Sequence, residues 1–370
     1  MSRIEFRLTA ATDVGCVRTN NEDNFITNHD LSQSDWFVPQ DVSQLIQLGK
    51  DGAILVVADG MGGLNAGEVA SAIAVDTVKR YFMDTNLSDI AKSQKSIEKF
   101  MCKVVVDADK ELKKHVKENP ETKGMGTTIV IAWVYGDIAH IVWCGDSRAY
   151  VFNPNEGLMR LTKDHSYVQE LVDAGKLDED LAIDHPDSNI ITRCLGDFRG
   201  RANPDYTAYR LKSGDTLMLC SDGLCGVCRD QEILQVMDEA KEDIEQCRKQ
   251  LILCALKAGG YDNVTVALFE AATVESDETT SSYTLFDEKN VRRINLSAED
   301  EENPKKKLMN TVELDESGFS EEEETETPKK KHKVDLTTTE TRSSGGLSNT
   351  LIIALLLIIL VLIAISFFKN

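Results

Sequence analysis

Two stretches decide the fold: AILVVADG at residues 53–60 and TLMLCSDG at residues 216–223. Each starts with an apolar run that fits a strand buried on both faces, and each ends abruptly on Asp-Gly. An ionised aspartate beside a hydrophobic core is costly unless a partner compensates its charge, which a divalent cation can do. Asp-Gly also opens turns readily, so either pair taken alone fits a simple turn.

More acidic residues lie at the borders of other expected strands. The run IAHIVWC at 138–144 leads to Gly145-Asp146, and VTVALF at 264–269 directly follows Asp262-Asn263. The complete set is Glu22 with Asp23, Asp59, Asp146, Asp222 and Asp262. Five such sites are hard to explain as turns alone. Ligands that are all carboxylates favour Mg²⁺ or Mn²⁺ over zinc, which prefers His and Cys.

Seven short motifs carry a resemblance to a known family. They are RTNNED at 18–23, DGMGG at 59–63, GMGTT at 124–128, GDSR at 145–148, LTKDHS at 161–166, SDGL at 221–224 and GYDNVT at 260–265. In sequence and in order they resemble the motifs of the metal-dependent, type 2C serine/threonine protein phosphatases, in their bacterial-type form. One such motif is weak support, but seven in order over roughly residues 5–270 are specific.

The resemblance implies an α+β fold. We expect a four-layer α-β-β-α sandwich of two antiparallel sheets flanked by helices, with a metal cluster at one edge between the sheets. Apolar residues spaced by three and four predict helices over 68–82 and 96–114. The segment 164–196 resembles the flap of bacterial-type members and is expected to form two short helices. We expect the catalytic domain to occupy residues 1–272.

The resemblance also implies a two-metal site. Its ligands here are Glu22, Asp59, the backbone carbonyl of Gly60, Asp222 and Asp262, with Asp59 bridging both ions. Two ions of Mg²⁺ or Mn²⁺ can lower the pKa of a shared water from about 16 to near neutrality. The expected nucleophile is therefore a metal-bridging hydroxide that attacks phosphoserine or phosphothreonine.

Arg18 and Asp23 are expected to assist that site. A planar guanidinium can grip two phosphate oxygens, so Arg18 is the expected phosphate-binding residue. Without the family context, Arg18 is better explained as a surface arginine that pairs with Glu22 or Asp23. Asp23 is expected to orient water or a ligand from behind the metal ligands.

Two positions depart from the family pattern. Met61 stands where many eukaryotic members have a histidine credited with general-acid catalysis, and methionine cannot donate a proton. A third ion in the family is held by the aspartate of GDSR and by a second acid that is Gly226 here. We therefore expect any third ion to bind weakly, through Asp146 and Asp222.

The histidines and cysteines are expected to be structural. His165 and His185 fit turns or partly buried faces better than a catalytic role. Cys225 and Cys228 form a CxxC that in isolation suggests redox or zinc chemistry. No second CxxC accompanies it, so we expect these cysteines to be small core residues. Nine cysteines without a signal peptide indicate a reducing cytosol.

The C-terminal part has a different composition. Residues 273–346 are rich in Glu, Lys, Ser and Thr and are expected to form a disordered linker. Residues 347–370 contain the run LIIALLLIILVLIAISFF at 351–368, about 27 Å long as a helix and sufficient to span a bilayer. Basic residues precede the run and only Lys369 follows it, which places the N-terminal side in the cytoplasm.

The expected protein is thus a membrane-anchored phosphoserine/phosphothreonine phosphatase. Its expected partners are phosphorylated proteins, among them membrane-associated Ser/Thr kinases and their substrates, and the lipid around the C-terminal helix. A net charge of −21 argues against nucleic-acid binding. Two alternatives remain open: a catalytically silent phospho-binding scaffold, and a phosphatase acting on a regulatory partner of a transcription factor. The retained acids disfavour the first, and the DGMGG and flap features disfavour the second.

Overall fold

The computed structural model describes residues 3–33, 42–62, 66–196, 202–275, 283–286 and 293–294, all within one unit that spans residues 1–312. Their strands form two main antiparallel sheets. One sheet has the order β11 (Asp205–Arg210), β8 (Ile138–Cys144), β7 (Ile129–Tyr135), β4 (Ala53–Ala58) and β2 (Asn24–Asn28). The other has the order β14 (Arg293–Ile294), β10 (Gly157–Arg160), β9 (Arg148–Asn153), β12 (Asp215–Cys220), β13 (Val264–Glu275), β1 (Arg3–Asp13) and β3 (Val42–Gln47). A short ribbon pairs β5 (Gly60–Met61) with β6 (Gly126–Thr127).

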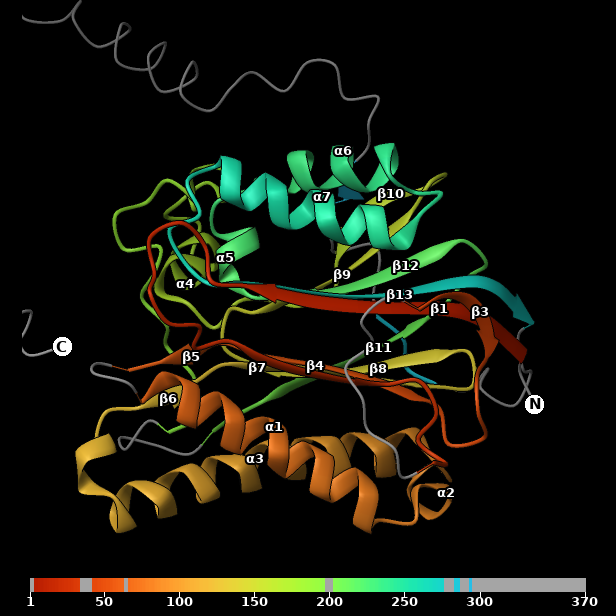
Figure 1. Cartoon of the computed structure of the whole chain (residues 1–370), viewed down its shortest axis with the longest axis horizontal. Coiled ribbons are helices and arrows are strands. Elements are labelled where there is room, and N and C mark those ends of the chain that lie inside the picture. Colours follow the sequence, from red (N-terminus) through yellow and green to blue (C-terminus); the bar gives the residue numbers. More distant parts are fainter. Residues whose placement is uncertain are drawn as a thin grey trace, which may run out of the picture. The chain divides into compact units, whose positions relative to one another are not determined.

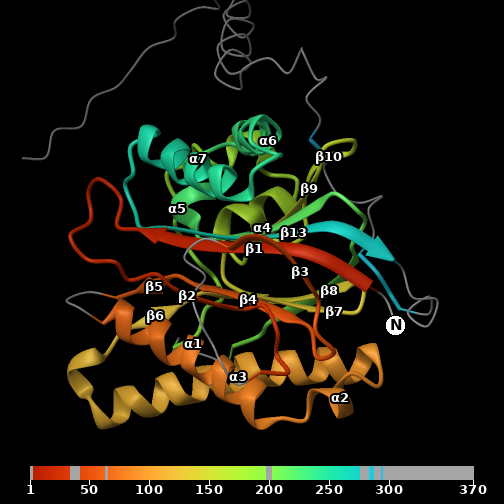
Figure 2. The same ribbon diagram turned by 45° about the vertical axis from the view of Figure 1, so that its right-hand side comes forward.

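Helices cover the outer faces of both sheets (Figure 1; turned by 45° in Figure 2). Over the five-stranded sheet lie α1 (Gly67–Asp84) and α3 (Gln94–Glu118), with the short α2 (Leu87–Ile90) and the 3₁₀ turn η1 (Pro120–Thr122). Over the seven-stranded sheet lie α6 (Asp230–Glu239) and α7 (Ile244–Lys257). The expected α-β-β-α sandwich is confirmed for the described residues.

Alternating burial along the strands explains the layers. In β4, Ile54 and Val56 face the core under α1 and α3, whereas Leu55 and Val57 face the core between the sheets. In β12, the neighbours Leu217 and Met218 likewise point to opposite faces. Side chains alternate because successive residues of a strand point to opposite sides. A continuous apolar run is therefore what a strand covered on both faces requires.

The predicted helices are confirmed with longer bounds. The prediction over 68–82 corresponds to α1, and the prediction over 96–114 corresponds to α3. Helix α3 begins two residues earlier, at Gln94, because Ser93 caps it, its side chain accepting a hydrogen bond from the Ser96 N–H. The flap segment, residues 164–196, contains two short helical elements, as predicted. They are the α-helix α4 (Tyr167–Asp173) and the 3₁₀ helix η2 (Glu179–Leu181).

Structure continues beyond residue 272, where the composition changes. Strand β13 runs to Glu275, and β14 adds the edge of the larger sheet beside β10. Phe286 packs against the core between the sheets, and its N–H donates to the Ala208 carbonyl at 2.7 Å. No helix in the described ranges is long and apolar enough to cross a membrane. The predicted anchor at 351–368 and most of the predicted linker lie outside those ranges.

Candidate metal centre and active site

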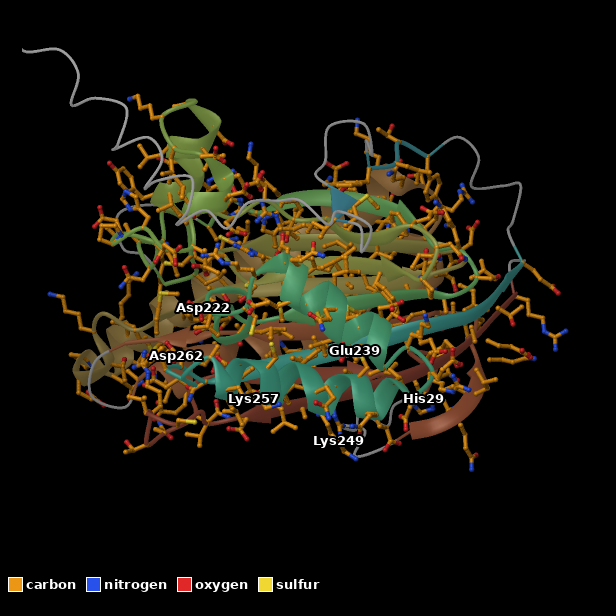
Figure 3. The ribbon with its side chains drawn as sticks, turned by 90° about the horizontal axis from the view of Figure 1, so that it is seen from above. His29, Asp222, Glu239, Lys249, Lys257 and Asp262 are labelled. Atoms are coloured by element: carbon orange, nitrogen blue, oxygen red, sulfur yellow. The ribbon has the colours of Figure 1, made fainter. Side chains whose placement is uncertain are left out.

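The acidic residues singled out in the sequence come from strand ends at the same end of the sandwich. Asp59 follows β4, and Asp23 precedes β2, the antiparallel neighbour of β4. Asp222 opens the short helix α5 (Asp222–Cys225) after β12, and Asp262 precedes β13, the antiparallel neighbour of β12. Antiparallel pairing brings the end of one strand beside the start of the next. Figure 3 shows Asp222 and Asp262 close together at this end.

Hydroxyl groups hold the backbone around Asp59. The Asp59 N–H donates to Thr128 Oγ1 at 3.1 Å, and Thr127 Oγ1 donates to the Asp59 carbonyl at 2.8 Å. Thr128 Oγ1 also lies 2.7 Å from Ser147 Oγ, in the loop that carries Asp146. The GMGTT and GDSR motifs therefore fix the positions of two candidate ligands relative to each other.

Close backbone packing explains two glycines beside the site. A Cβ added to Gly60 would lie 2.3 Å from the Gly67 carbonyl oxygen and 2.4 Å from the Glu22 carbonyl oxygen. A Cβ added to Gly67 would lie 2.4 Å from Glu22 Oε2. The Glu22 carboxylate thus lies directly against the first residue of α1. The role of the Gly60 carbonyl as a metal ligand stays a prediction.

Asp23 lies between the two sheets. Its Oδ2 accepts hydrogen bonds from Ser221 Oγ and Thr265 Oγ1, both at 2.7 Å. Burial raises the pKa of Asp23 to about 7; the two hydroxyls oppose that shift, and the charges of Asp222 and Asp262 add to it. A carboxylate in this position holds Ser221, the residue before Asp222, while a role for Asp23 behind metal ligands stays a prediction.

Buried and half-buried carboxyl groups crowd the centre. Burial and then the charge of Asp222 raise the pKa values of Asp59 and Asp146 well above the ordinary range. Burial also raises the pKa of Asp222, and burial followed by the charge of Glu68 raises that of Glu22. Carboxylates this close repel each other unless protons or cations compensate them.

Three buried oxygens at this end have no hydrogen-bond partner: Asp146 Oδ1, Asp222 Oδ1 and Glu68 Oε2. A buried acceptor without a donor needs an explanation, and a bound cation supplies one. Glu68 was not singled out in the sequence, where its only signal is an acid in the first turn of the helix after DGMGG. In the described part of the chain, no group of three or more His, Cys, Asp or Glu side chains is arranged to hold an ion unaided. Backbone and water oxygens would have to complete the coordination.

Arg18 pairs with Asp262, not with Glu22 or Asp23. Its Nη2 donates to Asp262 Oδ2 at 2.7 Å, and the Arg18 side chain is 52% exposed. The surface pairing considered for it in the sequence therefore exists, but with a different acid. The guanidinium lies beside the candidate ligands and is accessible, while phosphate binding by it stays a prediction.

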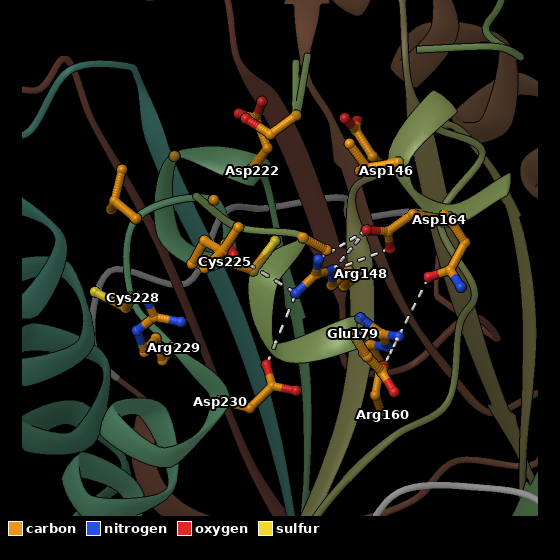
Figure 4. Close-up of a pocket in the computed structure, with 18 of the residues that line it drawn as sticks. Asp146, Arg148, Arg160, Asp164, Glu179, Asp222, Cys225, Cys228, Arg229 and Asp230 are labelled. Carbon is orange, nitrogen blue, oxygen red and sulfur yellow. Dashed lines mark hydrogen bonds and ion pairs between the residues drawn. The ribbon is translucent and has the colours of Figure 1, made fainter. Parts of the chain in front are cut away.

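A cavity of about 750 Å³ adjoins the acidic cluster and is lined by Asp146, Asp222 and Asp262 together with the flap segment and the start of α6 (Figure 4). Arginines connect the cavity wall to the flap segment. Arg148 Nη2 donates to Asp164 at 2.7 Å, Arg160 Nη2 to Glu179 at 2.7 Å and Arg229 Nη2 to Asp184 at 2.6 Å.

The histidines and Gly226 have structural roles. Buried His165 Nδ1 accepts from the Gly145 N–H at 3.1 Å, and its Nε2 lies 3.1 Å from Asp205 Oδ2. His185 Nδ1 accepts from the Asp187 N–H within a local turn. A Cβ at Gly226 would lie 2.7 Å from the Asp222 carbonyl, so this position has little room for a side-chain ligand.

The fold matches that of a known protein family. The family model described as "Protein phosphatase 2C" matches residues 37–280. The chain belongs to the protein phosphatase 2C family. Its enzymatic class is therefore that of metal-dependent serine/threonine protein phosphatases, and its relatives are bacterial.

Three relatives illustrate the match. The serine/threonine phosphatase stp of Listeria monocytogenes is 33% identical over 266 residues, which cover 72% of this chain and 94% of the relative. The crystal structure of the serine/threonine phosphatase Stp1 from Staphylococcus aureus is 35% identical with a TM-score of 0.59, covering 71% of this chain and 94% of that one. The catalytic domain of the phosphatase PstP in complex with two manganese ions is 30% identical with a TM-score of 0.57, covering 74% and 100%.

Proposed function

We propose that this type 2C phosphatase removes phosphate from serine and threonine in proteins with two Mg²⁺ or Mn²⁺ ions, while its C-terminus holds it at the cytoplasmic face of a membrane. The observation that carries the catalytic part is the cluster of buried and half-buried carboxyls at one end of both sheets, where Asp146 and Asp222 each have a buried oxygen without a partner. The manganese-bound PstP relative supports the choice of ion.

The ligands for the two ions would be Glu22, Asp59, Asp222, Asp262 and the Gly60 carbonyl. Asp146 would hold a weaker third ion. The donor set fits because it consists of oxygens, and because burial and then the charge of Asp222 raise the pKa values of Asp59 and Asp146, a cost of ionisation that cations would offset. When bound, the ions would lower the pKa of a water so that it can lose a proton and attack phosphorus, and they would offset charge on the phosphoryl group.

The chain's own residues would bind and position the substrate. Arg18 is half exposed, so its guanidinium can turn from Asp262 to two oxygens of a substrate phosphate. Asp23 would hold Ser221 and thereby the backbone at Asp222. Met61 has no proton to donate, so the proton for the departing serine or threonine oxygen must come from another group.

The membrane part of the proposal rests on the 18-residue apolar run at 351–368, which a single serine interrupts. A catalytic unit tethered in this way would meet membrane-associated phosphoproteins at a raised local concentration. Membrane-associated Ser/Thr kinases and their substrates are therefore the proposed clients. Deleting residues 347–370 should release the protein from membranes, and sedimentation of the truncated protein with membranes would refute the anchor.

Hydrolysis by the full-length protein tests the catalytic part. A phosphothreonine peptide and a small aryl phosphate should both be hydrolysed with Mn²⁺ and not with a chelator. Asp59→Asn and Asp222→Asn should each lose most of this activity, while Asp89→Asn, an exposed acid of α2, should match the wild type. Activity that persists in chelator, or in either ligand variant, would refute the two-metal mechanism. A phospho-binding scaffold would instead bind the peptide without releasing phosphate.

A further inference from the structure

The CxxC at 225–228 has a partner that the sequence did not indicate. Cys225 Sγ faces the Ser221 carbonyl within its own helical turn, at 3.6 Å. Cys228 Sγ instead lies 3.2 Å from Sγ of Cys254, 26 positions further along the chain in α7. The expectation that these cysteines are core residues holds for Cys225 and Cys228, which are both buried. The sulfur-to-sulfur contact is an additional feature.

We propose that Cys228 and Cys254 are a modification site, a thiol pair that a peroxide converts to a reversible disulfide. The two sulfurs need to approach by only about 1 Å to reach a bond length of about 2.0 Å. Cys228 lies in the loop between α5 and α6, which can adjust more easily than the helix that carries Cys254. In the described residues, no third His, Cys, Asp or Glu joins the pair to make a metal site.

The exposure of the two thiols sets the order of the chemistry. Cys254 is partly exposed, whereas Cys228 is 1% exposed. The Cys254 thiol loses its proton, and the thiolate attacks one oxygen of hydrogen peroxide and breaks the O–O bond; the products are a sulfenic acid and a hydroxide, which takes up the proton to give one water. The Cys228 sulfur then attacks the sulfenic sulfur, which forms the S–S bond and releases a second water. The two thiols lose two electrons and two protons, and the peroxide gains them.

The surroundings of Cys228 make this a slow reaction. Burial and the neighbouring Cys254 hold the pKa of the Cys228 thiol above its ordinary value, which lowers its thiolate fraction. The pair is therefore stable as a dithiol under reducing conditions. Because Cys254 lies next to Cys228, the second step is intramolecular and needs no access for an outside thiol.

The position of the pair connects it to the active-site cavity. Cys228 lines that cavity and directly precedes Arg229. Arg229 Nη1 donates to the Asp180 carbonyl at 3.2 Å and Nη2 to the Asp184 carboxylate at 2.6 Å, so it fastens the flap segment to the loop that contains Cys228. Figure 4 shows Cys228 and Arg229 side by side at the wall of the cavity.

Oxidation should therefore change how the cavity handles a protein substrate. Closing the bond pulls the Cys228 loop toward α7 and displaces Arg229 from its two flap contacts. We expect kcat/KM for a phosphothreonine peptide to fall at least threefold and to recover with dithiothreitol. This second step rests on the proposed phosphatase function, whereas formation of the disulfide does not.

Peptide mapping of the full-length protein tests the first step. Reduced protein is treated with hydrogen peroxide, its remaining thiols are alkylated, and its peptides are analysed without reduction. The peptides that contain Cys228 and Cys254 should appear joined, two hydrogens lighter than their sum, and Cys254→Ser should not form this species. Absence of the joined peptides, or a link from Cys225 to Cys228 in their place, would overturn the modification site.

Activity measurements on the same samples test the second step. Peroxide should lower wild-type activity toward the phosphopeptide and leave Cys254→Ser unchanged by the treatment. Cys102→Ser, which removes a partly exposed thiol of α3 on the opposite side of the sandwich, should respond like the wild type. Equal loss in Cys254→Ser, or a disulfide without any change in kcat/KM, would overturn the link to the flap. An inactive reduced protein would refute the phosphatase proposal while the mapping result stands.

Discussion

Manganese should stabilise this protein by an amount that grows with pH. Burial raises the pKa of Asp23 to about 7 and raises those of Asp59, Asp146 and Asp222 as well. A carboxyl group whose pKa is higher in the folded state contributes fully to stability below its unfolded pKa, and that contribution is lost as pH rises through the folded pKa. The metal-free protein should therefore lose stability between about pH 4 and pH 7.

The size of the pH-dependent loss follows from the shift of Asp23, and the size of the manganese effect follows from mass action. For Asp23, a change from 3.8 to about 7 corresponds to an upper limit of about 4 kcal/mol, at about 1.4 kcal/mol for each pKa unit. A cation at 100 times its dissociation constant adds about 2.7 kcal/mol per site, so two sites give about 5 kcal/mol. With about 2–4 °C per kcal/mol for a domain of this size, the melting temperature should rise by roughly 10–20 °C near pH 8. Near pH 5.5 the rise should be smaller, because protons compete with the cation for the carboxylates.

Thermal melts of the full-length protein, with chelator or with Mn²⁺, measure this directly at several pH values. Asp222→Asn should show a much smaller manganese-dependent rise, because it removes one crowded ligand. Asp89→Asn, which removes an exposed acid of the same charge, should behave like the wild type. An equal rise at about pH 5.5 and about pH 8, or a metal-free protein that gains stability over this range, would refute the reasoning.

Three further substitutions test particular contacts. Arg18→Ala should lower kcat/KM for a phosphothreonine peptide by about 10- to 200-fold, the equivalent of a charged hydrogen bond worth roughly 1.5–3 kcal/mol. Arg18→Lys should recover part of that loss. A change below about twofold in Arg18→Ala would exclude phosphate binding by this residue. Gly67→Ala should weaken the manganese-dependent rise in melting temperature, because its methyl group meets the Glu22 carboxylate. A rise equal to that of the wild type would contradict the placement of Glu22. Asp109→Ala should lower the free energy of unfolding in urea by about 2–4 kcal/mol, since this buried carboxylate accepts hydrogen bonds from the backbone N–H groups of Gly196 and Ala202. An unchanged urea midpoint of unfolding would contradict a stabilising role for Asp109.

The sequence itself predicted that β4 and β12 are buried on both faces, because burial leaves a direct pattern in it, whereas the four layers were implied by the family resemblance. The run AILVVA in β4 is apolar throughout since both of its faces are covered, one by helices and the other by the second sheet. The ends of β4 and β8 could be read equally well, because each apolar run stops at an acid or a glycine, whereas β13 continues past the acid that follows VTVALF to Glu275. Composition was a poorer guide to the end of the domain, since β14 and Phe286 add to the sandwich from a region that is polar overall.

Contacts between distant loops could not be predicted in this way. Arg18 and Asp262 are 244 positions apart, and their ion pair depends on how two loops meet after the sheets have formed. Cys228 could be assigned to Cys225 by spacing alone, yet the packing of α7 beside α5 brings it to Cys254. Glu68 likewise gains significance only because the first turn of α1 lies against Glu22.

Asp23, Asp146 and Asp222 show how hydrogen bonding, more than residue type, can separate positioning acids from proposed metal ligands. Asp23 Oδ2 accepts hydrogen bonds from two hydroxyls, which satisfy it without a cation. Asp146 is also buried and Asp222 is half-buried, but each retains a buried oxygen with no donor. A buried carboxylate that lacks donors is stable only when a proton or a cation supplies the missing charge. The same acidic side chain can therefore hold a strand end in place at one position and require a metal ion at the next.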